Sequence, residues 1–149
     1  MTRSVYAQEA TYCRTALVLG LIDGRVVHRW AERVIAQDPT PPSAFFDVVL
    51  VAESDLTELR HALWPLVVEP EPPDVLESVL GLIHSDLASG RRTLGDTVTV
   101  LRQMRSMLRL PPAMYADLNA ALVSDAVKTD RPATVTWLAK FAGRERKPI

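Results

Sequence analysis

The sequence has a single cysteine, Cys13, and one chain therefore cannot form an internal disulfide. Its longest apolar runs, residues 16–22 and 48–52, are far shorter than the roughly 20 residues that a membrane-spanning helix needs. Glu9 and Arg14 interrupt the N-terminal apolar segment that a secretory signal would need. These absences predict a soluble, cytoplasmic protein with no membrane segment and with Cys13 in the core.

The motifs of the common enzyme classes are also missing. There is no glycine-rich phosphate-binding loop and no serine in a nucleophile elbow. Glu58 and His61 have the Glu-x-x-His spacing of di-iron helical bundles, but neither His28 nor His84 has a glutamate three residues before it. We therefore predict no metal, no cofactor and no enzymatic activity. A catalytic site assembled from residues distant in sequence is the alternative that the sequence leaves open.

Helical periodicity and helix-capping residues occur along the whole chain. Gly20 suits the end of one helix and Asp23 the start of the next, and Pro-Pro pairs at 41–42, 72–73 and 111–112 each open a helix. Residues 48–51 and 97–100 could also be strands, but their flanking caps favour helix. The predicted helices cover residues 4–19, 24–37, 73–89, 93–108, 111–127 and 132–143, and two more begin at residues 42 and 55. A capping box is expected at Asp55–Glu58.

These helices predict an all-α fold, a single compact domain of seven to eight helices over residues 1–143. The packing is expected to be an orthogonal or layered bundle, with a frayed basic tail at 144–149. Trp30 should be buried between the first three helices. Val5, Ala16 and Leu17 are expected to face inward, and the apolar sets of the next helices are Phe45, Phe46, Val49, Leu50, Leu56, Leu59, Leu63 and Leu66.

The net charge of −1 conceals an uneven distribution of charged residues. Residues 1–90 carry 13 acidic and 6 basic side chains, whereas residues 91–149 carry 5 and 11. Nine carboxylates lie between residues 37 and 77 against one basic residue, Arg60. We interpret this segment as a protein-binding surface; the alternative is a solvated acidic face. The candidate partner-binding residues are Asp38, Asp55, Glu58, Glu69, Glu71, Asp74 and Glu77.

The predicted helix 93–108 has a basic stripe. Arg102, Arg105 and Arg109 follow one another at spacings that place them on a single helix face, and such a stripe can track phosphates. It lacks interleaved aromatic residues, however, and the chain is not basic overall. We therefore predict that the chain does not bind nucleic acid. A solvated face, or an intramolecular counterpart to the acidic half, accounts for the arginines.

Residues 16–51 contain a leucine-glycine-leucine sequence, a tryptophan-alanine-acidic sequence, an isoleucine and a helix opened by proline. The residues concerned are Leu19-Gly20-Leu21, Trp30-Ala31-Glu32, Ile35, Pro41-Pro42 and Asp47. This pattern resembles a group of small bacterial all-helical proteins, several of which look like immunity proteins of polymorphic toxin systems. Arg33 departs from it, because the group has a second acidic residue there. The resemblance carries over no catalytic residue.

Charge and resemblance together predict a non-enzymatic protein-binding domain. In its most concrete form, this would be a bacterial immunity-type protein that inhibits a cognate toxin by covering a basic toxin domain with carboxylates. Complementary charge of this kind speeds encounter and selects partners more than it raises affinity. The alternative is a helical adaptor or oligomerisation module without a toxin partner.

Overall fold

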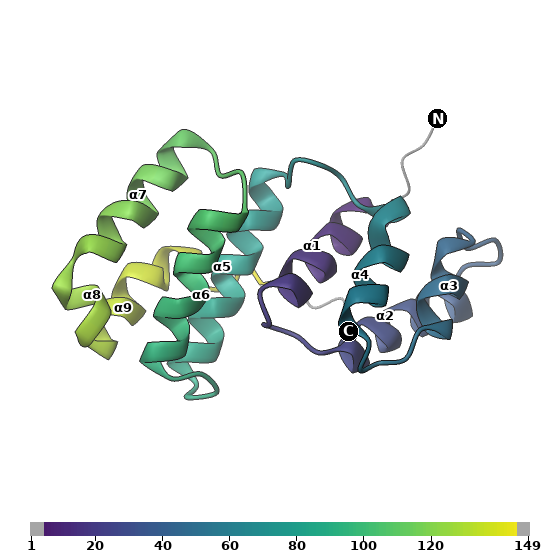
Figure 1. Cartoon of the computed structure of the whole chain (residues 1–149), viewed down its shortest axis with the longest axis horizontal. Helices are drawn as coiled ribbons and strands as arrows, with labels where there is room; N and C mark the ends of the chain where they lie inside the picture. Colours follow the sequence, from purple (N-terminus) through teal and green to yellow (C-terminus); the bar gives the residue numbers. More distant parts are fainter. Residues whose placement is uncertain (1–4, 146–149) are drawn as a thin grey trace. The chain divides into compact units, whose positions relative to one another are not determined.

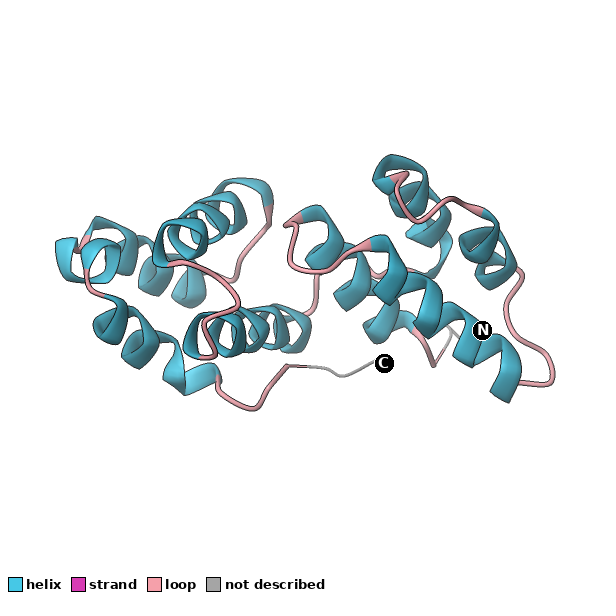
Figure 2. Cartoon of the chain, turned by 90° about the horizontal axis from the view of Figure 1, so that it is seen from below, coloured by secondary structure: helices cyan, strands magenta, loops and turns pink. Residues whose placement is uncertain are grey.

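The computed structural model describes residues 5–145, and within that range every regular element is a helix (Figure 1). Figure 2 shows the same residues as helices and connecting segments, without a strand among them. Residues 48–50 and 97–100 belong to helices, so the strand alternative is wrong and the all-α prediction is confirmed. The α-helices are α1 (Ala7–Val18), α2 (Gly24–Gln37), α3 (Ala44–Leu50), α4 (Leu56–Leu63), α5 (Pro73–Ala88), α6 (Leu94–Met107), α7 (Pro112–Val123), α8 (Asp125–Thr129) and α9 (Arg131–Leu138). Two 3₁₀ turns are η1 (Trp64–Leu66) and η2 (Ala139–Phe141).

The contacts within the chain divide it into two compact units. Residues 5–69, with α1 to α4 and η1, form unit 1, and residues 70–145, with α5 to α9 and η2, form unit 2. The boundary lies between Glu69 and Pro70, inside the proline-rich connection. That residues 1–143 behave as a single domain therefore stays a prediction. Of the expected frayed tail, Arg144 and Glu145 are described, and residues 146–149 lie outside the described range.

Helix ends follow the local chemistry of the sequence. Gly20 and Gly90 have positive φ angles of 72° and 81° just after α1 and α5, a conformation that other residues adopt only with strain. Asp23 accepts a hydrogen bond from the Val26 amide at 3.1 Å, and α2 covers the predicted residues 24–37. Thr93 caps α6 in the same way.

One predicted helix is two in the structure. Residues 111–127 were expected to be continuous, but α7 ends at Val123 and α8 begins at Asp125. Ser124 between them has φ −79° and ψ 123°, an extended conformation that interrupts the helical hydrogen bonds. Serine is common at such helix boundaries, although the Ser124 hydroxyl makes no capping hydrogen bond here.

Trp30 is the central residue of the unit 1 core. Its side chain is only 1% exposed, and its ring meets that of Phe45 at a centroid distance of 5.0 Å in an edge-on arrangement. Its indole Nε1 donates to a carboxylate oxygen of Glu9 on α1 at 2.9 Å. The predicted burial of Trp30 between the first three helices is thus confirmed. Cys13 belongs to the same core, and burial raises the pKa of its thiol well above the usual value.

Four apolar residues expected on inner faces are exposed instead. The short helix α3 buries Phe45 and Val48, so Phe46 and Leu50 lie on its opposite side with 44% and 82% of their surface exposed. Leu56, at the first position of α4, is 42% exposed, and Val5 precedes α1 and is 85% exposed. The error has one cause: in short helices and at helix ends, apolar residues outnumber the positions that face the core.

Two glycines allow close approaches between segments. A Cβ atom on Gly24, the first residue of α2, would lie 1.9 Å from the carbonyl oxygen of Glu53, so the segment before α4 rests directly on the start of α2. A Cβ on Gly81 in α5 would lie 2.7 Å from the carbonyl oxygen of Phe141 and 2.8 Å from the amide nitrogen of Glu145. In unit 2, η2 and the chain after it therefore cross α5 backbone to backbone.

Candidate functional site

The seven predicted partner-binding carboxylates fall on both units. Asp38, Asp55, Glu58 and Glu69 belong to unit 1, and Glu71, Asp74 and Glu77 belong to unit 2. Each one must therefore be assessed by what it contacts within its own unit.

The Asp38 carboxylate is engaged in hydrogen bonds within unit 1. It accepts hydrogen bonds from the Tyr6 hydroxyl at 2.6 Å and from the Thr40 amide at 2.9 Å. Both bonds lower the pKa of Asp38, and the bond from Tyr6 has the larger effect. The bond between Tyr6 and Asp38 also raises the pKa of Tyr6. Asp38 follows the last residue of the 14-residue helix α2, about 20 Å along the axis from Gly24 and the Glu53 carbonyl that rests on it. Its carboxylate thus lies far from the start of α4.

Asp55 and Glu58 have local roles at the start of α4. Asp55 accepts a hydrogen bond from the Glu58 amide at 3.1 Å, which caps the helix. The capping box is only half formed, because the Asp55 amide donates to the Ala52 carbonyl instead of to the Glu58 side chain. Glu58 lies 3.8 Å from His61 in an exposed pair, which is the surface contact that its spacing allows on one helix face.

The remaining four carboxylates surround the proline-rich connection. Glu77 forms an ion pair with Arg144, and Asp74 lies in the first turn of α5, where a negative charge stabilises the helix end. Glu69 and Glu71 make no ion pair or side-chain hydrogen bond with any residue in the range 5–145. These two are the carboxylates of the predicted set that have no structural role of their own.

The three arginines of the predicted stripe do not lie on one helix face in the structure. Helix α6 ends at Met107, and Leu108 has ψ 150°, so Arg109 lies beyond the helix. Leu108 leaves helical geometry as the chain approaches the proline pair 111–112. Arg105 donates to the side-chain oxygen of Asn119 on α7 at 2.9 Å and is partly buried, whereas Arg102 and Arg109 are exposed.

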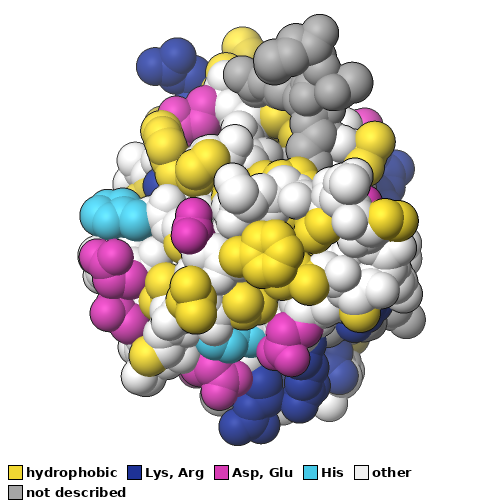
Figure 3. All heavy atoms as spheres, turned by 90° about the vertical axis from the view of Figure 1, so that its right-hand side faces the viewer, with side chains coloured by type: hydrophobic (Ala, Val, Ile, Leu, Met, Phe, Trp, Pro, Cys, Tyr) yellow, Lys and Arg dark blue, Asp and Glu magenta, His cyan; other side chains and the backbone are white. Residues whose placement is uncertain are grey.

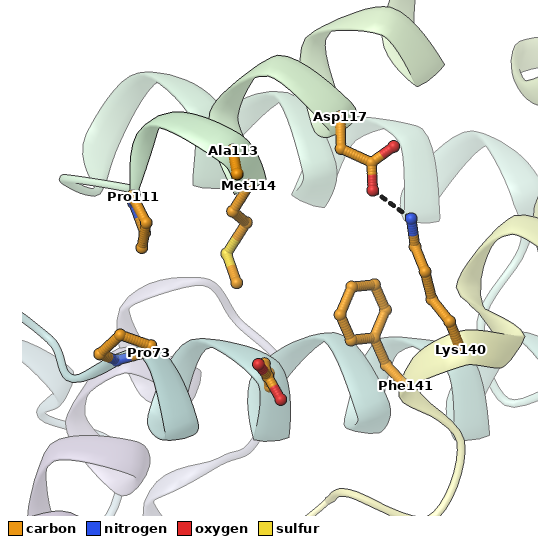
Figure 4. A pocket seen from close by; sticks show the side chains of 8 residues that line it. Pro73, Pro111, Ala113, Met114, Asp117, Lys140 and Phe141 are labelled. Atoms are coloured by element: carbon orange, nitrogen blue, oxygen red, sulfur yellow. Dashed lines mark hydrogen bonds and ion pairs between the residues drawn. The ribbon is translucent and has the colours of Figure 1, made fainter.

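Unit 2 contains a cavity of about 340 Å³ that the sequence analysis did not predict. Figure 4 shows its apolar walls: Pro73 and Pro111 face each other at one end, while Met114 and the ring of Phe141 project into the middle. These residues come from the starts of α5 and α7 and from η2. These three segments are separated by tens of residues in the sequence, so no spacing pattern could have shown that they line one cavity. Of the patterns noted in the sequence, only the proline pairs at 72–73 and 111–112 coincide with residues that line this cavity.

Charged side chains line the other end of this cavity. Asp117 forms an ion pair with Lys140 across the opening, as the dashed line in Figure 4 shows, and it also accepts a 3.4 Å hydrogen bond from the indole of Trp137. The Lys140 ammonium lies 4.9 Å from the ring centre of Trp137 and 5.5 Å from that of Phe141. Glu77, paired with Arg144, also lines the cavity, one helical turn after Pro73 on α5.

Neither the arrangement of metal-binding residue types in the described range nor similarity to known proteins assigns a further function. Residues 5–145 contain no group of three or more His, Cys, Asp or Glu side chains placed to hold a metal ion. None of the helices in that range has the length and apolar character needed to cross a membrane. No protein-family model, curated protein or solved structure matches the chain. The resemblance of residues 16–51 to immunity-type proteins stays a prediction.

Proposed function

We propose that the chain is a non-enzymatic cytoplasmic protein that binds another protein through carboxylates near its proline-rich connection. The observation that supports this is the state of Glu69 and Glu71, which have no ion-pair partner among residues 5–145. Unlike those of Asp38, Asp55, Glu58 and Glu77, their side chains form no hydrogen bond or ion pair with the described residues. Unbalanced carboxylates repel one another, so their grouping has a small cost that a basic partner would offset.

The local backbone favours such a use. Pro70, Pro72 and Pro73 restrict the φ angles of the segment, and the Val68 amide donates to the Thr11 hydroxyl on α1 at 2.8 Å. Glu69 therefore follows an anchored residue and precedes a restricted one. A segment whose backbone is already restricted loses little conformational entropy when a partner binds it.

The most concrete partner is a basic toxin domain, in keeping with the resemblance to immunity-type proteins. On this proposal the toxin contacts Glu69 at the end of unit 1 and Glu71, Asp74 and Glu77 in the first residues of unit 2. The charges would steer the toxin into contact and discriminate against acidic or neutral partners. Neutralisation would follow from masking the toxin surface, with no chemical step by this chain.

Capture of the partner tests this proposal. The tagged protein is used to isolate complexes from its source cells, and the captured protein is identified by mass spectrometry. A captured basic toxin whose expression kills a bacterial host, and whose killing is prevented by co-expression of this chain, would support the proposal. Continued killing despite a stable complex would refute neutralisation while leaving protein binding intact.

One observation favours the alternative of an oligomerisation module. Phe46 and Leu50 stand one helical turn apart on α3, and both are exposed. Figure 3 faces the side of the chain where α3 lies in Figure 1, and hydrophobic side chains occupy the middle of that face with charged groups around them. Light scattering after size-exclusion chromatography decides between the two: a dimer that Phe46→Ser with Leu50→Ser converts to a monomer supports this alternative.

A further inference from the structure

We propose that the cavity of unit 2 binds a small organic cation with an apolar body, such as an arylalkyl ammonium ion. This ligand site has a different occupant from the protein-binding surface proposed above, although it shares Glu77 and Pro73 with that segment. The cavity volume of about 340 Å³ lies within the range of small-molecule sites, which are mostly apolar with a few polar groups. The arrangement of its two ends sets the charge and orientation of the ligand.

The proline end suits the apolar body of a ligand. Helix N-termini normally attract anions through free backbone amides. Here Pro73 and Pro112 occupy the first positions of α5 and α7, and Pro111 precedes α7, so each of these helix starts has fewer free amides than usual. The rings of Pro73 and Pro111 instead present apolar surface, which Met114 extends toward the centre.

The opposite end suits a cation. Asp117 and Lys140 lie at this end, and Glu77 adds a second carboxylate to the cavity lining from α5. Lys140 itself shows how an ammonium is held there, next to Asp117 and close to the rings of Trp137 and Phe141. Carboxylates and aromatic rings are the usual partners of an organic ammonium group.

The existing ion pairs do not block this end. The side chains of Asp117 and Lys140 are 44% and 45% exposed, and a pair this open to solvent is weak. Lys140 can therefore turn outward and share Asp117 with a ligand. Glu77 also lines the cavity, while its partner Arg144 does not.

A titration monitored by nuclear magnetic resonance tests the proposal on the full chain. The probes are 3-phenylpropylammonium, 3-phenylpropanoate and 3-phenylpropanol, which differ only in the polar group. With ¹³C-labelled methionine methyl groups, the ammonium probe should shift the Met114 signal saturably with a Kd of about 1 mM, and about tenfold more tightly than the carboxylate. A carboxylate that binds as tightly, or a Met114 signal unmoved by all three probes at tenfold that concentration, overturns the proposal.

Variants test which groups select the charge. Asp117→Asn with Glu77→Gln should weaken binding of the ammonium probe about tenfold and leave that of the alcohol unchanged. Asp96→Asn with Asp125→Asn removes two carboxylates that do not line the cavity and serves as the matched control. If the first pair of changes unfolds the chain, Asp117→Asn alone is used, with a smaller loss expected. Equal losses in test and control variants would show that overall charge, and not the cavity, attracts the cation.

Discussion

The indole nitrogen of Trp30 donates to a carboxylate oxygen of Glu9 at 2.9 Å, which joins α2 to α1 at the edge of the unit 1 core. The tryptophan is otherwise enclosed by apolar side chains, with Phe45 of α3 against its ring. A buried indole N–H without an acceptor would be costly, and Glu9 removes that cost. One side chain therefore connects three helices through packing and one hydrogen bond.

Replacing Trp30 with alanine should lower the free energy of unfolding by about 3–5 kcal/mol. The loss combines buried apolar area, the cavity left behind and an unpaired Glu9. Trp64→Ala is the matched control, because Trp64 is about half exposed and lies outside the unit 1 core; it should cost about 1 kcal/mol. Urea denaturation measures both changes. Equal effects of the two substitutions would mean that Trp30 is not central to the core.

Gly24→Ala should destabilise unit 1 because the new methyl group would collide with the backbone carbonyl of Glu53. A backbone atom cannot turn aside as a flexible side chain can, so the loss should be about 2 kcal/mol or more. Gly95→Ala in α6 meets open space and should be neutral or stabilising by up to about 1 kcal/mol. Thermal unfolding of the two variants measures this contrast, and a stable Gly24→Ala protein would contradict the close approach.

The Tyr6–Asp38 bond should make stability depend on pH at both extremes. The pKa of Asp38 is lowered in the folded state, so its contribution is complete above the ordinary value of 3.8 and is lost as the pH falls through the folded pKa. The pKa of Tyr6 is raised, so its contribution is complete below 10.0 and is lost as the pH rises through the folded pKa. The stability difference between wild type and Tyr6→Phe should be constant near neutral pH and shrink at both ends.

Chemical denaturation across the pH range measures this difference. Tyr115→Phe is the control, because no side-chain hydrogen bond involves Tyr115 among residues 5–145. Its difference from wild type should stay flat over the same range. A Tyr6→Phe difference that is also flat would show that the bond does not persist in solution.

The parts of the fold that the sequence predicted are those governed by local chemistry. Asp23 and Gly20 determine helix ends through bonds within a few residues, and Trp30 lies in the middle of a clear helical pattern. The exposure of Phe46 was missed because seven residues of α3 are too few to show which apolar side faces the core. Local pattern also could not show that Asp38 would be bonded to Tyr6, which is 32 residues away.

The cavity of unit 2 was missed for a related reason. Met114 and Asp117 lie on α7, and Phe141 reaches the same cavity from η2, which crosses α5 at Gly81. In the sequence Gly81 is one small residue within a helix, and no pattern marks it as a crossing point. Contacts of this range depend on the packing of whole helices, which residue spacing does not encode.

Duplex DNA or RNA should bind the chain no better than at about millimolar concentration at physiological salt. Arg105 is engaged by Asn119, and Arg109 has left the helix, so no continuous basic face remains on α6. Fluorescence anisotropy with a labelled duplex measures this. Micromolar binding that weakens steeply with added salt would show phosphate contacts and contradict the prediction.

The central claim is that the carboxylates of the proline-rich connection recruit a protein partner. Reversing Glu69, Glu71 and Asp74 to lysine should change the melting temperature by only a few degrees, because none of the three forms an ion pair in the range 5–145. Reversing Glu32, Asp47 and Asp96, which are also exposed, gives a control with the same change in net charge.

The most direct measurement is the association rate with the captured partner, followed by stopped-flow fluorescence at several salt concentrations. For wild type the rate should fall as salt rises, and the reversed variant should associate at least about tenfold more slowly at low salt while the control variant stays close to wild type. If the reversed variant associates as fast as wild type, or if the control slows equally, the carboxylates of this segment are only a solvated surface and the account is wrong.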